Sequence, residues 1–264
     1  MNRTTILEEL SADGVLLLTL NRPDRKNAFN NLMWRELRDA LGEAQDNDNV
    51  RVVVVTGAGN AFSAGQDLSE MMSGGNDGEE HGFASFMDRL CIFDKPLIAA
   101  VNGVGVGIGL TLLLHCDYVY IVPEARLRAP FITLGVVPEA ASSYLLPLLL
   151  GHRKAIDLLF ESDFISADRA LELGLATHLS SAVLLLQESL EHARRLAAKP
   201  IGSLRWTKRL VLAARQDAVT AARRREDEAF RCRVGSPENL EAVTAFFEKR
   251  PPDFSSVPMA DVER

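Results

Sequence analysis

Glu139 is the side chain in this sequence best placed to carry chemistry. It stands in residues 137–143 (Val-Pro-Glu-Ala-Ala-Ser-Ser), where a helix is expected to begin. A carboxylate held beside a reacting carbon can take a proton from it and return the proton elsewhere, which is general acid–base chemistry. A Pro–Glu pair is also ordinary at a helix start, because proline fits the first turn and the helix dipole favours an acid there. The local sequence leaves both roles open.

Two turns built from small residues supply a second kind of chemistry. Residues 62–68 (Phe-Ser-Ala-Gly-Gln-Asp-Leu) follow an expected strand at 51–56, and residues 101–109 follow an apolar run at 96–101. Small-residue turns at the carboxyl ends of strands leave backbone N–H groups pointing at a ligand. A pair of such donors can stabilise a developing oxyanion.

The second turn has glycine at every other position from 103 to 109. This alternation does not match G-x-G-x-x-G, so it does not predict a dinucleotide site. It fits two interpretations equally well, close packing of a helix on a strand or N–H groups that reach a ligand. The first turn favours the ligand interpretation.

The elements that must position these groups alternate along the first part of the chain. Apolar runs predict strands at 15–20, 51–56, 97–101 and 118–122, and helical spacing predicts helices at 27–44 and 110–115. Such alternation indicates an α/β fold with parallel strands. A glycine-rich loop is expected at 73–82, over the first turn. After residue 183 the sequence predicts helices alone, at 184–198, 202–214, 219–234 and 237–249. We therefore expect a core at 1–200 and a helical C-terminal subdomain at 201–264.

Composition narrows the function classes. The 264 residues are 47% hydrophobic and carry a net charge of −7, which argues against a nucleic-acid binder. Cys91, Cys116 and Cys232 are odd in number and widely spaced, so we expect reduced thiols and neither disulfides nor a metal site. No apolar run is long enough to span a membrane and no signal peptide is apparent, so we expect a soluble cytoplasmic protein.

Several segments form a recognisable set along nearly the whole chain: Asn21-Arg22-Pro23 with Lys26-Asn27-Ala28-Phe29, then residues 62–68, 95–103, 116–117, 134–138, 170–175 and 244–250. In order and spacing, this set resembles the crotonase (enoyl-CoA hydratase/isomerase) superfamily. The resemblance implies a crotonase-like fold, a spiral of ββα units with a helical C-terminal part that builds trimers or dimers of trimers. It also implies an acyl-CoA thioester as the substrate, with coenzyme A belonging to that substrate and no separate cofactor.

The resemblance assigns the two oxyanion donors to the backbone N–H groups of Ala64 and Ile108. The second position is often glycine in the family, and a side chain there is expected to tilt the acyl group without removing a backbone contact. Ile108 also stands where a helix begins, so the helix dipole adds to its hydrogen bond.

The acids indicate which reaction follows. The family's hydratases use two glutamates, which by motif position would fall at Thr111 and Phe131, and neither carboxylate is present. The segment around Glu139 resembles that of the peroxisomal-type Δ3,Δ2-enoyl-CoA isomerases, whose Pro-Glu-x-x-Ser-Ser carries a single catalytic glutamate. The expected activity is therefore a double-bond shift, with Glu139 moving a proton from C2 to C4.

The resemblance also implies contacts with coenzyme A and the acyl group. Arg25 and Lys26 match the segment that lies along the coenzyme, and Phe246 and Lys249 match residues that approach its adenine and phosphate, often from a neighbouring subunit. Asp67 is expected as a helix N-cap as well. The apolar acyl end would be lined by residues such as Phe131. The remaining expected substrate contacts are Ala28, Gly65, Gln66, Leu68 and Gly107.

Three rival functions stay open from the sequence. The first is a hydratase that uses Glu139 alone to activate water, and the second is a lyase, dehalogenase or ring isomerase acting on another acyl-CoA. The third is a non-catalytic acyl-CoA-binding protein that kept the fold after losing both hydratase acids.

Overall fold

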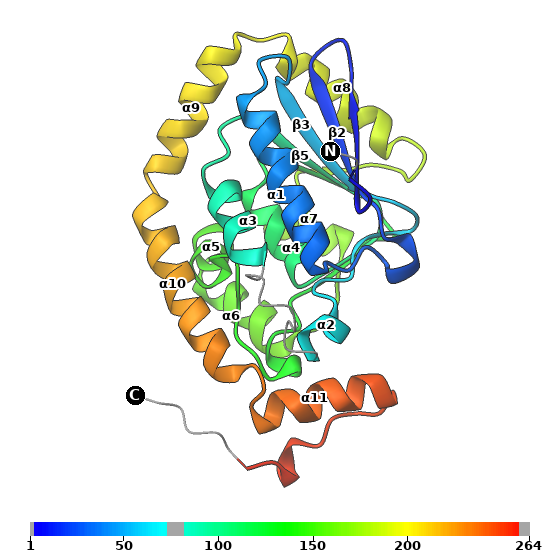
Figure 1. Cartoon of the computed structure of the whole chain (residues 1–264), viewed down its shortest axis with the longest axis vertical. Coiled ribbons are helices and arrows are strands. Elements are labelled where there is room, and N and C mark those ends of the chain that lie inside the picture. Colours follow the sequence, from blue (N-terminus) through cyan, green and yellow to red (C-terminus); the bar gives the residue numbers. More distant parts are fainter. Residues whose placement is uncertain (1–2, 73–81, 259–264) are drawn as a thin grey trace.

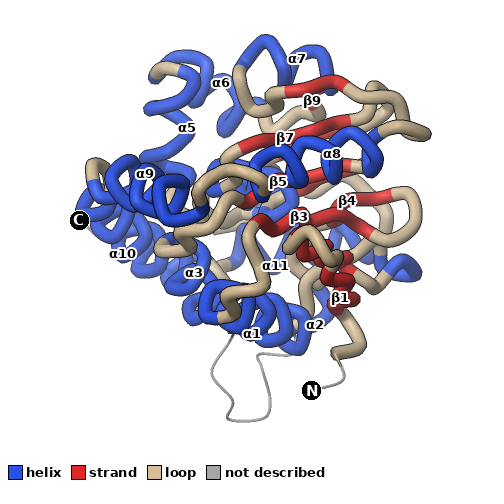
Figure 2. The backbone as a smooth tube through the Cα atoms, turned by 90° about the horizontal axis from the view of Figure 1, so that it is seen from above, coloured by secondary structure: helices blue, strands red, loops and turns tan. Residues whose placement is uncertain are grey.

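The chain folds into two β-sheets enclosed by helices (Figures 1 and 2). The computed structural model describes residues 3–72 and 82–258, so the loop expected at 73–82 lies outside the described residues except for Gly82. In the described part, the first sheet has six strands, of which the first two pair antiparallel and the others parallel. In spatial order they are β1 (Ile6–Leu10), β2 (Val15–Leu20), β3 (Val52–Gly57), β5 (Leu97–Val101), β7 (Tyr118–Ile121) and β10 (His178–Leu179).

The central strands of the first sheet each continue into a short strand of a second sheet. The second sheet runs in the order β4 (Ala61–Ser63), β6 (Val104–Val106), β8 (Arg126–Arg128) and β9 (Ile165–Ser166). Thus β3 leads to β4, β5 to β6 and β7 to β8, and a helical segment follows each pair. This repetition is a spiral of ββα units, so the crotonase-like fold class predicted from the sequence is confirmed.

Helices cover the sheets and continue to the C-terminus. Strands β3 and β5 are buried along their whole length, so both faces of the sheet centre are covered. On one face α8 packs against β2, β3, β5 and β7, and α1 packs with α3 on the other (Figure 2). The helices are α1 (Asn31–Asp46), α2 (Leu68–Met72), α3 (Gly82–Cys91), α4 (Ile108–Thr111), α5 (Ser142–Leu150), α6 (His152–Glu161), α7 (Ala167–Leu173), α8 (Leu185–Ala197), α9 (Ile201–Ala213), α10 (Gln216–Arg233) and α11 (Pro237–Glu248), with 3₁₀ turns η1 (Pro23–Arg25), η2 (Leu112–His115), η3 (Ile132–Leu134) and η4 (Phe254–Ser256).

Two of the expected helices have different bounds, for local reasons. The helix expected from residue 27 begins at Asn31, because Lys26 and Asn27 are left-handed, with φ of 49° and 56°. Asn30 then caps the helix, its side-chain oxygen accepting a hydrogen bond from the Met33 N–H at 2.9 Å. The helix expected at 110–115 is instead α4 followed by η2, both almost wholly buried.

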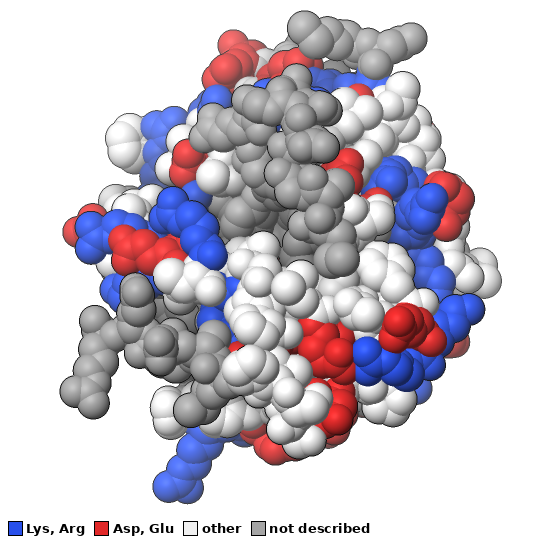
Figure 3. Space-filling model, turned by 60° about the horizontal axis from the view of Figure 1, so that its bottom comes forward, with Lys and Arg blue, Asp and Glu red and all other residues white. Residues whose placement is uncertain are grey.

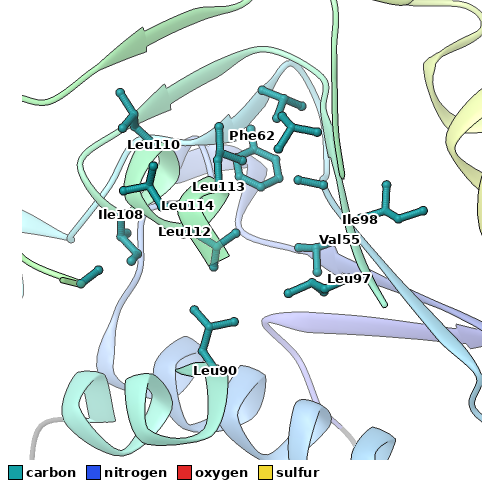
Figure 4. Packing of buried hydrophobic residues seen from close by; sticks show 14 of the residues in the cluster. Val55, Phe62, Leu90, Leu97, Ile98, Ile108, Leu110, Leu112, Leu113 and Leu114 are labelled. Atoms are coloured by element: carbon teal, nitrogen blue, oxygen red, sulfur yellow. The ribbon is translucent and has the colours of Figure 1, made fainter. Parts of the chain in front are cut away.

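The buried segment formed by α4 and η2 fills the space between the first sheet and α3. Figure 4 shows Leu112 and Leu113 beside Phe62, with Leu90 of α3 pointing toward them. Their side chains are at most 3% exposed. The rigid apolar packing beneath α4 fixes the position of the turn that precedes it.

Lys95 is a buried cation that joins α1 to the strand β5. Its side chain is 1% exposed, and Nζ donates hydrogen bonds to the carbonyls of Ala44, Asn47 and Val50 at 2.7, 2.8 and 2.8 Å. Ala44 and Asn47 lie at the C-terminal end of α1, where carbonyls lack helical partners and a cation is favoured by the dipole.

We expect Lys95→Met to lower the free energy of unfolding by about 3 kcal/mol, because three buried carbonyls lose their donor while the apolar stem is kept. Urea unfolding followed by circular dichroism measures the change. Lys154→Met, at an exposed position of α6, is the matched control and should stay within about 0.5 kcal/mol of the parent. Equal midpoints for the two variants would contradict a stabilising role for the Lys95 ammonium.

Charged side chains fasten α9 to the core. Asp94, 2% exposed, accepts two hydrogen bonds from the Arg205 guanidinium at 2.9 and 3.0 Å and one from Arg209 at 2.6 Å. Lys208 of the same helix donates to Asp117 at 2.7 Å. From this anchor, α9, α10 and α11 run around one side and the bottom of the core in Figure 1.

Candidate active site

The two small-residue turns lie side by side, because β4, at the start of the first turn, pairs in parallel with β6, which lies within the second. Gly65 has a φ of +93°, and a Cβ added there would lie 2.8 Å from the Val106 carbonyl oxygen and 3.9 Å from the Gly107 Cα. Gly107 is also left-handed, with a φ of +55°. The structure therefore brings together the residues that were expected to supply the oxyanion donors.

The Ile108 N–H group stands at the start of α4. The Gly107 carbonyl accepts the first hydrogen bonds of the helix, from Leu110 at 2.8 Å and Thr111 at 2.9 Å. As the first helical residue, Ile108 has no partner for its N–H within the helix. Nor does any other described residue accept a hydrogen bond from it. This donor is available to a ligand.

The Ala64 N–H group is engaged within the protein. It donates to the Lys26 carbonyl at 2.8 Å, and the neighbouring Gly65 N–H donates to the Ser63 hydroxyl at 3.1 Å. Lys26 is exposed and left-handed, at the end of η1. The role predicted for Ala64 therefore requires the Lys26 carbonyl to give up this hydrogen bond when a ligand binds.

Three of the four alternating glycines serve close packing. A Cβ on Gly103 would lie 2.2 Å from the Asn60 carbonyl oxygen, one on Gly105 2.8 Å from Leu127, and one on Gly109 2.6 Å from the Ser63 carbonyl oxygen. Gly107 alone in this set meets no such obstacle, its nearest neighbour being the Gly65 Cα at 3.9 Å. Close packing thus explains the glycines at 103, 105 and 109. Only residues 107 and 108 remain as candidates whose N–H groups could reach a ligand.

Glu139 reaches back to the α4 segment. The Thr111 hydroxyl donates to Glu139 Oε1 at 2.5 Å and lies 3.3 Å from the Gly107 carbonyl oxygen. The other carboxyl oxygen, Oε2, is buried and has no hydrogen-bond partner among the described residues. Glu139 is therefore held by one oxygen and presents the other, with the Ile108 donor in the same short helix as Thr111.

Burial of the Glu139 carboxyl, which disfavours its ionised form, raises its pKa to about 8. The hydrogen bond from Thr111 acts in the opposite direction, and the negative charges of Glu226 and Asp227 add to the rise. A carboxyl with a pKa near neutrality can both accept and return a proton, which suits general acid–base catalysis.

The backbone that follows Glu139 is unusual and is tied down from two other elements. Ala140 and Ala141 are both left-handed, with φ of 58° and 59°, a costly conformation for residues other than glycine. His115 Nε2 lies 2.8 Å from the Ala140 carbonyl, and because a carbonyl only accepts, this nitrogen carries the proton. Burial lowers the His115 pKa to about 4, so the ring is neutral. Glu226 of α10 accepts hydrogen bonds from the N–H groups of Ala141 and Ser143.

Local sequence patterns do not indicate the roles of His115 and Glu226. His115 has no metal-ligand spacing to another histidine, and Glu226 directly follows three arginines. Glu226 lies 85 positions from Ala141, so no local spacing links them. The two left-handed alanines carry no compositional mark either, because glycine is the usual residue in such a turn.

The residues expected around the first turn have structural partners. Asp67 accepts hydrogen bonds from the Ser69 N–H at 3.2 Å and from Arg22 at 3.0 Å, as suits the residue before α2. Burial works against ionisation of Asp67, but hydrogen bonds from Ser69 and Arg22 hold its pKa below its usual value. Gln66 accepts from the Trp34 indole at 3.0 Å. Leu68 begins α2 and is half-buried.

The expected coenzyme contacts are spread over two regions. Lys26 lines a cleft of about 370 Å³ with Asn60, Asn102, Glu124 and Arg126 among its walls. Glu139, Thr111 and Ile108 do not line this cleft, so it is separate from the acid. The exposed Arg25 lies beside Lys26, and Ala28 is buried at 9% exposure.

Phe246 and Lys249 lie at the end of α11, and Phe131 lies in the core. Phe246 is 59% exposed and packs edge-on against Phe247, while Lys249 is exposed. The start of α11 contacts η3, where Asn239 donates to the Leu134 carbonyl at 2.7 Å. On the face shown in Figure 3, basic and acidic side chains of the described residues surround a mainly uncharged centre. Phe131 is 4% exposed, and its carbonyl accepts from Val136.

Neither a metal centre nor a membrane-spanning helix is found in the part of the chain that the structure describes. Across 3–72 and 82–258, no group of three or more His, Cys, Asp or Glu side chains is arranged to hold a metal ion. Within the same ranges, no helix combines the length and the apolar character needed to cross a bilayer.

Comparison with known proteins gives a consistent result. Residues 11–257 match the family model described as enoyl-CoA hydratase/isomerase. The chain is 35% identical to 2,3-dehydroadipyl-CoA hydratase from Escherichia coli over 91% of its length and 94% of that enzyme. It is 33% identical to enoyl-CoA delta isomerase 2 from Rattus norvegicus over 91% of its length and 63% of that longer protein. The crystal structure of an enoyl-CoA hydratase/isomerase from Pseudoalteromonas atlantica superposes with a TM-score of 0.90 at 39% identity, covering 95% of this chain and 99% of the other.

Proposed function

The chain belongs to the enoyl-CoA hydratase/isomerase family, and within it we propose that the protein is an enoyl-CoA isomerase that moves a double bond from the 3- to the 2-position of an acyl-CoA. The observation that carries the proposal is the contact between Glu139 and Thr111, which brings one carboxyl beside the α4 segment. By the resemblance, Thr111 and Phe131 fall at the positions where the family's hydratases carry their two acids. One acid suffices for a proton shuttle, whereas syn-hydration needs both a base for water and an acid for C2.

In the proposed reaction, the thioester oxygen accepts the Ile108 N–H and, once Lys26 has yielded it, the Ala64 N–H. Glu139 Oε2 takes the proton from C2, breaking the C2–H bond, and the electron pair passes into the dienolate held by the two donors. The same carboxyl then delivers its proton to C4. The double bond finishes between C2 and C3, and no atom is gained or lost.

The raised pKa of Glu139 predicts a specific pH dependence. Only the ionised carboxylate can take a proton from C2, so kcat/KM should rise with pH, by about tenfold per unit, until it levels off near a pH of about 8. Initial rates in buffers of constant ionic strength between pH 5.5 and 9.5 measure this rising part of the pH profile, the acidic limb. A rate that is flat across pH 6–9 would contradict Glu139 as the base in the free enzyme.

The function is tested by giving the protein 3-enoyl-CoA and 2-enoyl-CoA separately in D₂O and following products by mass and absorbance. Conversion of the 3-enoyl ester to the 2-enoyl ester with no water added supports the isomerase, and a product free of deuterium would mean that Glu139 returns the proton it took. Addition of water to the 2-enoyl ester would replace it with a hydratase that uses Glu139 alone; the Escherichia coli relative is itself named a hydratase. If neither ester reacts, the protein acts on another acyl-CoA substrate or is a binding protein.

We further propose that the cleft beside Lys26 receives part of the coenzyme. Lys26 and Arg126 supply positive charge suited to a phosphate, although Glu124 in the same wall limits the attraction. Phe246 and Lys249, exposed at the end of α11, are proposed to contact the nucleotide from a neighbouring subunit in a trimer or dimer of trimers. Light scattering of the protein as it elutes from a gel-filtration column, with and without an acyl-CoA, measures the molar mass of the oligomer.

A further inference from the structure

The carboxylate of Glu226 accepts hydrogen bonds from the turn that follows Glu139. It lies on α10 and is 4% exposed, with Oε2 accepting the Ala141 N–H at 2.7 Å and Oε1 accepting the Ser143 N–H at 2.8 Å. Both of its oxygens are therefore used on backbone donors within four residues of Glu139. Such a two-point contact fixes position and orientation together.

The turn at Ala140 and Ala141 needs contacts from other elements to keep its backbone conformation. Ala140 and Ala141 are consecutive left-handed residues, and each costs free energy that surrounding contacts must offset. The Glu226 carboxylate satisfies the N–H of the second of them, and the His115 ring satisfies the carbonyl of the first. Without Glu226 the turn can relax toward ordinary backbone angles, which would swing the Glu139 side chain away from Thr111.

We propose that Glu226 is a positioning residue for the isomerase reaction, holding the Glu139 carboxyl on Thr111 and keeping a fixed negative charge behind it. This inference rests on the proposed function. The charge keeps Glu139 easy to protonate, so that the proton taken from C2 is retained long enough to reach C4. Glu226 itself touches no reacting atom.

The charged groups around Glu139 come mainly from α10. Glu226 and Asp227 both face Glu139 with negative charge, while α4 contributes only the Thr111 hydroxyl and η2 the neutral His115 ring. Arg223 and Arg231 offset the charge of Asp227. Burial raises the pKa of Glu226 above its usual value, and the hydrogen bonds from Ser143 and Ala141 oppose this rise without any contribution from a cation. When Glu226 is ionised, its charge therefore acts on Glu139 with little compensation.

Glu226→Gln separates positioning from simple support of the fold. The amide keeps the shape but loses the charge and can accept only one of the two N–H groups. We expect the plateau kcat at high pH to fall by about tenfold or more, because a displaced base reacts poorly, with KM within about twofold. The acidic limb should move to lower pH by about half a unit or more, because a neighbouring negative charge is gone.

Glu228→Gln is the matched control, with the same change of charge at an exposed position on the same helix. It should leave plateau and limb unchanged. Glu226→Asp keeps the charge on a shorter arm, so it should lower the plateau while leaving the limb in place. If Glu226→Gln retains the parental plateau and limb at a temperature where it is folded, the proposal is wrong, even if its melting temperature falls.

A readout without substrate keeps this test independent of the proposed activity. The Glu139 carboxyl band can be followed by infrared titration, with Glu139→Gln subtracted to isolate it. Glu226→Gln should lower the pH at which that band ionises, and Glu228→Gln should not. A failed isomerase assay with this shift present would overturn the function alone, whereas an unshifted band would overturn the role of Glu226.

Discussion

Glu139→Gln is expected to lower the isomerisation rate by about 10²–10⁴-fold, the usual contribution of a positioned acid–base group. The amide has nearly the same shape and can still accept a hydrogen bond from Thr111, so the turn should keep its conformation. It cannot take a proton from C2. Affinity for a non-reactive acyl-CoA should change by less than about threefold, because the thioester donors are backbone groups elsewhere.

The rate of 3-enoyl-CoA isomerisation and calorimetric binding of a saturated acyl-CoA give the two measurements for Glu139→Gln. Glu161→Gln, at an exposed position ending α6, controls for loss of a negative charge. Isomerisation at the parental rate in Glu139→Gln would move the catalytic role to another group. If the parent protein binds the acyl-CoA but isomerises none of the 3-enoyl ester, the non-catalytic interpretation is favoured.

Gly65→Ala is expected to cost about 10²-fold in kcat, comparable to the loss of one oxyanion donor. A methyl group at this position would lie 2.8 Å from the Val106 carbonyl oxygen, and the φ of +93° is strained for alanine. Since the obstacle is backbone, the two turns must separate, which moves Ala64 away from Ile108. The loss should appear in kcat more than in KM, because donors aimed at a developing charge act mainly in the transition state.

Gly202→Ala provides the comparison for Gly65→Ala, because a Cβ at residue 202, within α9, meets nothing within 4 Å. It should leave kcat unchanged and raise the melting temperature slightly, since alanine favours a helix. Steady-state kinetics at 25 °C and melting curves recorded in parallel compare kcat and melting temperature between the two variants. Parental kcat in a folded Gly65→Ala protein would mean that the close approach of the two turns does not matter for the reaction.

The sequence predicted the parts of the fold that rest on local pattern. The β-branched run at 52–55 and the apolar run at 97–101 became central strands, because strands covered on both faces need continuous apolar residues. The motifs also singled out Glu139, whose catalytic role stays a prediction, and they indicated that the two turns act as a pair. The short strands of the second sheet, β10 and β1 were missed, since two or three residues show no alternation and β1 is exposed at four of its five positions.

What the sequence could not predict depends on contacts between distant residues. The hydrogen bond from the Ala64 N–H to the Lys26 carbonyl depends on the left-handed backbone at Lys26. A lysine side chain does not predict that backbone conformation. The contact of Thr111 with Glu139 spans 28 positions, and it changes Thr111 from a missing acid into the partner of the acid that is present. The raised pKa of Glu139 follows from burial, which is a property of the folded molecule.

The link between Glu226 and the turn at Ala141 has a consequence for how the protein is made. Synthesis proceeds from the N-terminus, and the sheets and α5 are encoded well before residue 226. A nascent chain that has folded only this far lacks the carboxylate that holds the left-handed turn. Even a well-formed core should therefore remain inactive until α10 has left the ribosome and docked, so the acquisition of activity reports the completion of the last helices and not the formation of the sheets.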